Sequence, residues 1–292
     1  ARVFMIEWGT VSKMDAILMR IVTLIVGAAV ASLAAALIWF DRQFEEPEAE
    51  LVPSVAGVLE AKSVLAVFAH PDDEQLVTGL LLRAKSRDGA ITRMITATKG
   101  EAGNQTPVVA RQEDLGVVRH AEALKSGFSL GIDEQEVWDY PDSGVVDADY
   151  EELVRRLMDR MALWQPDLIV TFWPESGFSN HPDHMRVGQA TRDAVYRMRQ
   201  TLPERAPSTI AYVLAPRQMM SRFGGERGQL VASNQPAPTH AMPGEAVAKI
   251  RGWEIHASQR NYVRDVYGMP AWFLHRVNDK EFYYVEEFSD QP

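Results

Sequence analysis

The stretch VLAVFAHPDDE, residues 64–74, is an uncharged apolar run that ends abruptly in a histidine, a proline and three acids. Apolar residues without alternation are typical of a strand buried on both faces of a parallel sheet. Two comparable runs follow along the chain, ITRMITAT at 91–98 and DLIVTF at 167–172. We therefore predict three strands, of which the first and third are central.

Amphipathic stretches separate and follow these runs. We predict helices at about 75–87, 109–127, 149–163, 184–199 and 245–260. Strands that alternate with helices indicate βαβ units, so the predicted fold is α/β, a Rossmann-like, mostly parallel sheet with flanking helices. The Gly- and Pro-rich segment 216–244 is predicted to be a long loop or lid, and FYYVEEF (282–288) a closing strand.

Composition narrows the possible functions. The 292 residues carry 30 Lys and Arg against 40 Asp and Glu, a formal net charge of -10. Such a chain gains little from a polyanion through counterion release, so we expect no nucleic-acid partner. The sequence has no cysteine, so a metal would have to be held by His, Asp, Glu or other oxygen ligands. Nucleotide-loop and serine-hydrolase motifs are absent from it as well.

The N-terminal segment differs in composition from the rest of the chain. Residues 21–40, IVTLIVGAAVASLAAALIWF, carry no charge over a length that matches the ~30 Å hydrocarbon core of a bilayer. We predict a transmembrane anchor. One alternative is a cleaved signal peptide, whose apolar region is normally about 7–15 residues long. The other is a buried core helix, for which the many small residues offer little to pack.

Flanking charges and composition divide the rest of the chain. Three Lys or Arg residues precede the apolar segment and one, Arg42, follows it closely. The positive-inside rule then predicts that residues 1–20 are cytoplasmic and that the catalytic domain is extracytoplasmic. The acidic, proline-containing residues 41–60 are predicted to be a linker. The predicted protein is thus a single-pass membrane protein with one folded domain at 61–292.

Histidines and acids gather at the carboxyl ends of two predicted strands. AHPDDE (69–74) ends the first strand, and HPDH (181–184) follows the third strand after a turn-rich loop. Prolines and acids also suit the first turn of a helix, so either cluster alone has an ordinary structural explanation. In open α/β sheets, however, ligands bind at the carboxyl ends of the strands.

If the two strands are neighbours, their loops converge and bring together His70, Asp72, Asp73, His181 and His184. Two imidazoles and a carboxylate are the three protein ligands of a catalytic zinc site, which keeps a fourth position for water. A non-ligating carboxylate nearby can take a proton from that water, so these residues predict a metal-dependent hydrolase. Spacing alone does not decide which acid is the ligand and which is the base.

AHPDDE and HPDH resemble the two signature motifs of the LmbE-like, or PIG-L, family of zinc-dependent N-deacetylases. TKGEAGN (98–104), the segment 111–132, YPDSG (140–144) and KIRGWEIHASQ (249–259) also resemble family segments. The resemblance implies a hydrolase that removes the N-acetyl group of an N-acetylglucosamine-type sugar or glycoconjugate by attack of a zinc-bound water. Fe²⁺ would fit the same ligands.

The resemblance also implies roles for individual residues. His70, Asp73 and His184 would be the zinc ligands, and Asp72 the general base. His181 would stabilise the oxyanion and protonate the leaving amine.

Four further residues complete the expected site. Asp183 would orient a ligating histidine. Arg111 matches the family's substrate-facing arginine, although a solvated helix charge explains it equally well. Glu101 and Asn104 lie on the loop after the second strand and could bind substrate. His256 fits a family segment, but a single histidine on a helix is more often structural.

Two alternatives to the deacetylase remain open. A catalytically silent carbohydrate-binding or scaffold domain would bind metal and sugar without releasing acetate. A zinc hydrolase of another amide or of an ester would share the mechanism and differ only in its substrate. Strand ends fix chemistry while loops shape pockets, so we expect the segment 216–244 to influence substrate choice.

Overall fold

The computed structural model describes residues 13–288 and divides into two units, with the boundary between Gln43 and Phe44. The first unit contains one long helix, α1 (Lys13–Asp41), whose side chains from Met14 to Trp39 are exposed. This helix is long and apolar enough to cross a membrane, and none of its most apolar stretch is buried, unlike the core helix of a globular domain. A signal sequence would have the same properties. The first twelve positions of the predicted segment 1–20 lie outside the described residues.

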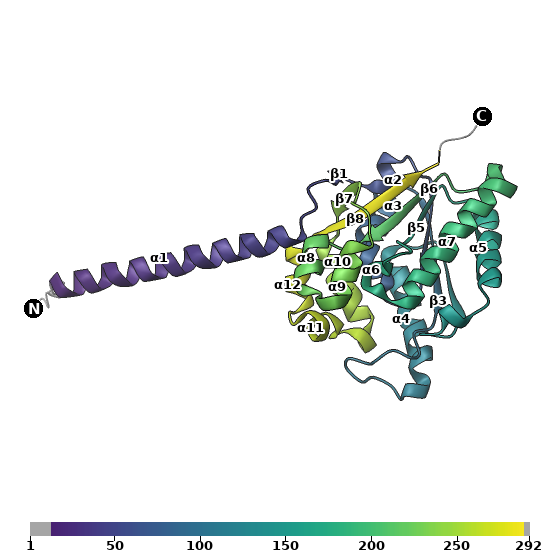
Figure 1. The fold of residues 1–292 in the computed structure, drawn as a ribbon. Helices are drawn as coiled ribbons and strands as arrows, with labels where there is room; N and C mark the ends of the chain where they lie inside the picture. Colours follow the sequence, from purple (N-terminus) through teal and green to yellow (C-terminus); the bar gives the residue numbers. More distant parts are fainter. Residues whose placement is uncertain (1–12, 289–292) are drawn as a thin grey trace, which may run out of the picture. The chain divides into compact units, whose positions relative to one another are not determined.

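The second unit is built on an eight-stranded sheet (Figure 1) in the order β1-β7-β8-β6-β5-β2-β3-β4. Its strands are β1 (Glu50–Leu51), β2 (Ser63–Phe68), β3 (Ile91–Thr98), β4 (Glu134–Tyr140), β5 (Leu168–Phe172), β6 (Thr209–Leu214), β7 (His240–Pro243) and β8 (Lys280–Glu287). Strands β4, β3, β2, β5 and β6 run parallel, and β8 is antiparallel to both β6 and β7. The predicted α/β fold with a mostly parallel sheet is confirmed.

Helices cover both faces of this sheet (Figure 1). Helices α3 (Thr78–Ser86) and α4 (Leu115–Leu130) pack with α10 (Ala246–Ile255), and α5 (Tyr150–Trp164) packs with α7 (Pro182–Thr201). The remaining helices are short: α2 (Val55–Val58), α6 (Gly177–Asn180), α8 (Arg217–Phe223), α9 (Gly225–Ser233), α11 (Tyr262–Tyr267) and α12 (Ala271–Val277). Local sequence sets several ends, since the Asp149 side chain caps α5 and Pro182 opens α7.

The order of the strands determines where a ligand can bind. The chain runs from β2 through β3 to β4 and then crosses back to β5, which lies on the other side of β2. Both central strands are buried, and Phe68 packs edge-on against Phe172 with ring centroids 5.1 Å apart. The crevice outside the carboxyl ends of β2 and β5 is the point where the strand order reverses, which is the usual ligand site of open α/β sheets.

Residues 44–60, which the sequence predicts to be part of a linker, are instead packed into the domain. Strand β1 pairs with β7, and Val55 and Ala56 of α2 are fully buried. The Glu46 carboxylate is also buried and pairs with Arg217 at 2.8 Å. These contacts join segments far apart in the sequence, so local acidity and proline content could not reveal them.

The segment 216–244 is not the predicted long loop, because it forms α8, α9 and β7. The two helices have only seven and nine residues, which is too short for a clear helical periodicity, and Gly224 separates them. The sequence prediction also missed β4 and β6. Closing strand β8 is confirmed at Lys280–Glu287.

Candidate active site

The two polar segments meet at the carboxyl ends of neighbouring strands, as expected. Val64 and Ala66 of β2 are in register with Leu168 and Val170 of β5. This pairing brings the first loop and the start of α7 together, although 114 positions separate His70 from His184 in the sequence.

The predicted ligand atoms lie close enough to share one metal ion. His70 Nδ1 is 3.0 Å from His184 Nε2, and the Asp73 carboxylate lies 3.5 Å from the former and 3.2 Å from the latter. Ligands bound tetrahedrally at about 2.0–2.2 Å are separated from each other by about 3.4 Å. All three side chains are buried. The donor set therefore fits a zinc-sized cation, and His181 lies near enough to the two histidines to belong to the same metal-capable group.

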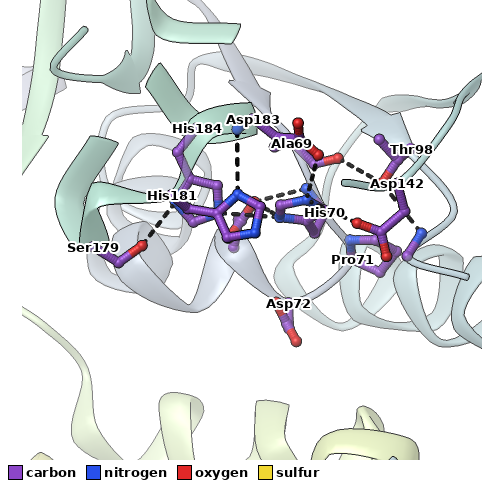
Figure 2. A network of polar contacts seen from close by, with 12 residues as sticks. Ala69, His70, Pro71, Asp72, Thr98, Asp142, Ser179, His181, Asp183 and His184 are labelled. Carbon is purple, nitrogen blue, oxygen red and sulfur yellow. Dashed lines mark hydrogen bonds and ion pairs between the residues drawn. The ribbon is translucent and has the colours of Figure 1, made fainter. Parts of the chain in front are cut away.

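Carboxylates hold the opposite nitrogen of the central histidine (Figure 2). His70 Nε2 lies 3.2 Å from Asp142 and 3.3 Å from Asp183. Asp183 is fully buried and also accepts the backbone N–H groups of Ser143 and Val145 at 2.8 and 3.2 Å. The two carboxylate contacts fix the ring of His70 and leave its Nδ1 directed at the proposed metal position, as carboxylates do for ligating histidines in many metal sites.

The second histidine predicted to be a ligand, His184, is oriented in a similar way. His184 Nδ1 lies 2.9 Å from the Gly177 carbonyl oxygen, so it carries a proton and leaves Nε2 free as a ligand. Its ring stacks on Phe172 at 4.1 Å, which adds a packing constraint from β5. Gly177 has φ +55, a backbone conformation that favours glycine and that turns its carbonyl toward the ring.

Asp72 projects apart from the ligand cluster (Figure 2). Its backbone has φ +103, the left-handed region that aspartate adopts only under constraint. Its carboxylate accepts a hydrogen bond from Arg119 at 3.0 Å, and the same guanidinium donates to the carbonyls of Pro71 and Gly100 at 2.6 and 2.8 Å. Burial raises the pKa of Asp72 to about 6, with Arg119 opposing and the neighbouring Asp73 adding to the shift.

His181 caps α7. Its Nδ1 accepts the backbone N–H of Asp183 at 3.2 Å, so the proton of the neutral ring sits on Nε2. Partial burial and the positive charges of His184 and His70 lower the pKa of His181 to about 4. The ring therefore acts as a neutral hydrogen-bond donor.

A buried acid lies behind the Asp72 loop. Glu74 is 1% exposed and is paired with His256, which comes from the C-terminal end of α10. Burial alone would raise the pKa of Glu74, but the charge and hydrogen bond of His256, together with hydrogen bonds from Ser126 and Gln75, lower it to about 2.

One cavity of about 670 Å³ contains the site. The ligand cluster, Asp72 and His181 form one wall. The facing wall comes from β6, α8 and the C-terminal helices and is largely apolar, with Leu214, Met219 and Val263 among its residues. This volume falls within the range of roughly 300–1,000 Å³ that is typical of small-molecule sites.

The residues expected to bind substrate have different positions. Asn104 lines the cavity. Glu101 is exposed and does not line the cavity of the described domain, and its carboxylate accepts the backbone N–H of Asp142 at 3.0 Å. Arg111 is not among the residues that line the cavity of the described domain, because its exposed side chain pairs with Glu113 and Asp114.

Sequence reasoning missed three members of the site: Arg119, Asp142 and Glu74. The signals were present, since Arg119 lies in the segment 111–132 and Asp142 in YPDSG, both of which resemble family segments. The sequence offered no way to tell that Arg119 rather than Arg111 reaches Asp72.

Comparisons with known proteins agree with this geometry. The family model described as "PIG-L: GlcNAc-PI de-N-acetylase" matches residues 65–195. The chain is 32% identical over 242 residues to "Probable N-acetyl-alpha-D-glucosaminyl L-malate deacetylase 2" of Bacillus anthracis, covering 79% of this chain and 97% of that protein. It is also 32% identical over 179 residues to "1D-myo-inositol 2-acetamido-2-deoxy-alpha-D-glucopyranoside deacetylase" of Corynebacterium urealyticum, covering 52% of this chain. The match covers 53% of that relative, so the chain spans about half the length of several of the curated relatives it matches.

Solved structures share the fold. N,N'-diacetylchitobiose deacetylase of Pyrococcus horikoshii superposes with a TM-score of 0.58 at 18% identity, covering 80% of this chain and 86% of that one. The 4-carboxy-2-hydroxymuconate hydratase of Pseudomonas putida gives 0.57 at 15% identity, covering 79% and 99%. Because a deacetylase and a hydratase share this architecture, the fold alone does not decide the reaction. The sequence matches do decide the family: the chain belongs to the PIG-L, or LmbE-like, deacetylase family.

Proposed function

We propose that this protein is a zinc-dependent hydrolase that removes the N-acetyl group from an N-acetylglucosamine-type glycoconjugate. The observation that carries the proposal is the convergence of a three-residue metal-ligand set and a separate carboxylate, Asp72, in one cavity. The names of the relatives, which are deacetylases of glucosaminyl conjugates, support the choice of reaction.

Each residue of the site has a distinct task. His70, Asp73 and His184 would hold the metal, which when bound acidifies a water molecule and polarises the acetyl carbonyl. Asp72 accepts the proton of the attacking water. Arg119 holds the Asp72 carboxylate by a hydrogen bond at 3.0 Å.

His181 stabilises the charge that develops during attack. Its Nδ1 is occupied by the N–H of Asp183, so its Nε2–H can donate to the oxygen that becomes negative. The proton that Asp72 took from the water passes to the departing nitrogen as the carbon–nitrogen bond breaks, which releases acetate and a free amine. Asp142 and Asp183 keep His70 in one orientation throughout.

The apolar wall of the cavity indicates a substrate larger than the acetamido group. A metal site that accepts only an acetamido group needs little space, whereas this cavity continues along Leu214, Met219 and Val263. We infer that the second half of a glycoconjugate occupies this region and that its side chains select the conjugate.

Acetate release by the detergent-solubilised full chain tests the proposal. N-acetylglucosaminyl conjugates of inositol and of malate, the substrates named for the relatives, should release acetate with zinc and not with excess chelator. Metal binding without release from any conjugate would favour a silent carbohydrate-binding domain. Release from an ester or an unrelated amide alone would favour a different hydrolase.

We also propose that α1 anchors the protein in a membrane through residues 21–40, with the catalytic domain on the extracytoplasmic side. The support is an exposed apolar helix and a small excess of preceding Lys and Arg. In intact cells or spheroplasts, external protease should degrade the domain. A domain that is protected until the membrane is opened would contradict the orientation.

A further inference from the structure

Glu74 takes no part in the chemistry proposed above, yet it is among the most buried acids of the described domain. Its carboxylate accepts four hydrogen bonds. One oxygen receives His256 Nε2, Ser126 Oγ and Gln75 Nε2 at 2.5, 2.5 and 3.1 Å, and the other receives the backbone N–H of Asp72 at 3.0 Å. Glu74 is thus bonded directly to the main chain of the residue proposed as the general base.

The Asp72 main chain needs this support because its φ of +103 lies in a region that strains any residue with a side chain. Two hydrogen bonds close the turn around it. The Asp72 N–H donates to Glu74, and the Asp72 carbonyl accepts the N–H of Gln75 at 2.9 Å. If the first bond were lost, the backbone could relax toward an ordinary φ and carry the carboxylate away from its position beside Arg119.

His256 fixes Glu74 from a distant part of the chain. Its side chain is fully buried at the end of α10, 182 positions after Glu74. A buried acid and histidine are costly to desolvate, and apolar residues of similar volume would often give an equally stable or more stable core. A contribution to stability alone therefore does not account for this pair.

We propose that the buried Glu74–His256 pair is a positioning device that holds the strained Asp72 backbone so that its carboxylate reaches the attacking water. Glu74 and His256 act through Asp72 and touch no substrate. The proposal rests on the proposed function, in which Asp72 is the base.

Glu74→Gln tests the device with minimal change in shape. A carboxamide has one acceptor oxygen, so its NH₂ group must face either the Asp72 N–H or the donors of His256 and Ser126. We expect kcat to fall by about 10²-fold, the cost of misplacing a reacting group by about 1 Å. KM and the metal content should stay close to wild type, because no ligand or cavity wall changes.

Glu122→Gln is the matched control. Glu122 is a second buried acid, on α4, and it accepts the N–H and Oγ of Ser258 at 2.8 and 2.6 Å. It therefore binds the same C-terminal segment that carries His256, but it makes no hydrogen bond to the Asp72 loop. This variant should lose unfolding free energy comparably to Glu74→Gln and keep the wild-type kcat.

Two His256 variants serve if Glu74→Gln does not fold. His256→Gln keeps a side-chain N–H donor and should restore much of the rate that His256→Leu loses. The positioning role would be overturned if His256→Gln and His256→Leu had the same kcat. It would also be overturned if Glu74→Gln kept the wild-type kcat, or if Glu74→Gln and Glu122→Gln lost kcat equally. Asp72→Asn, measured in parallel, separates the two proposals. If it is active, the base assignment fails; if it is inactive while Glu74→Gln is normal, only the positioning proposal fails.

Discussion

Removing the charge of Asp183 should weaken metal binding without dismantling the site. In Asp183→Asn one oxygen must replace two. In the wild type, Oδ2 faces His70 Nε2 at 3.3 Å and the Ser143 N–H at 2.8 Å, while Oδ1 accepts the Val145 N–H at 3.2 Å. The amide cannot satisfy all three donors, and the contact with His70 loses its negative charge.

The expected loss of metal affinity depends on the carboxylate that still contacts His70 in the variant. Loss of a carboxylate behind a ligating histidine typically costs about 10–100-fold in metal affinity, or about 1.4–2.7 kcal/mol. Asp142 still lies 3.2 Å from the same nitrogen, so we expect about tenfold for Asp183→Asn. Removing both carboxylates should reach the upper end of that range.

Competition with a chromophoric zinc chelator at neutral pH measures this affinity directly. Asp193→Asn is the matched control, because Asp193 lies on the same helix and accepts the hydroxyl of Tyr150 at 2.6 Å, away from the metal ligands. A zinc affinity of Asp183→Asn equal to that of wild type would refute the reasoning. An equal loss in Asp193→Asn would refute it as well, by pointing to a general effect of helix charge.

Three further predictions concern acid stability, the base and the cavity. Burial lowers the pKa of His275 to about 3, so the unfolded chain binds a proton below about pH 6.5 that the folded chain refuses; stability is lost as the pH falls, by about 2 kcal/mol at pH 5. Urea unfolding at pH 7 and pH 5 should show a loss that is smaller by about this amount in His275→Gln, which can still accept the indole N–H of Trp253, because the other titrating groups are the same in both proteins. Arg119→Lys cannot reproduce a guanidinium that donates to three groups, so kcat should fall by about 10–100-fold with zinc retained; unchanged kcat would exclude Arg119 from holding the base. Met219→Ser should raise KM several-fold for conjugates with apolar groups and leave KM for free N-acetylglucosamine unchanged, whereas an equal rise for both would contradict a conjugate site at the apolar wall.

The central strands and the convergence of the proposed metal ligands were predictable because their signals are local. Uncharged runs identify β2 and β5. A histidine- and acid-rich segment follows β2 directly and another follows β5 after a turn-rich loop, and together the two point to a ligand crevice. Once β2 and β5 are taken as neighbours, their loops must bring His70 and His184 together.

The remaining parts depend on contacts between distant segments. The sequence of residues 44–60 is typical of a linker, and only the pairing of β1 with β7 makes this segment part of the domain. Glu46 is likewise buried in an ion pair with the distant Arg217. Arg111 and Arg119 lie on one segment, and the direction of each side chain is a tertiary property. His256 is equally ambiguous in sequence, since its partner Glu74 lies 182 positions away.

Acetate release by zinc-loaded wild type and zinc-loaded Asp72→Asn tests the central claim most directly. The variant leaves His70, Asp73 and His184 in place, so both proteins should contain the same amount of zinc. We predict that wild type releases acetate from an N-acetylglucosaminyl conjugate while the variant loses nearly all turnover. Substantial turnover by Asp72→Asn with zinc bound would contradict the account, because the water would then be activated without the carboxylate that this fold places beside the metal site.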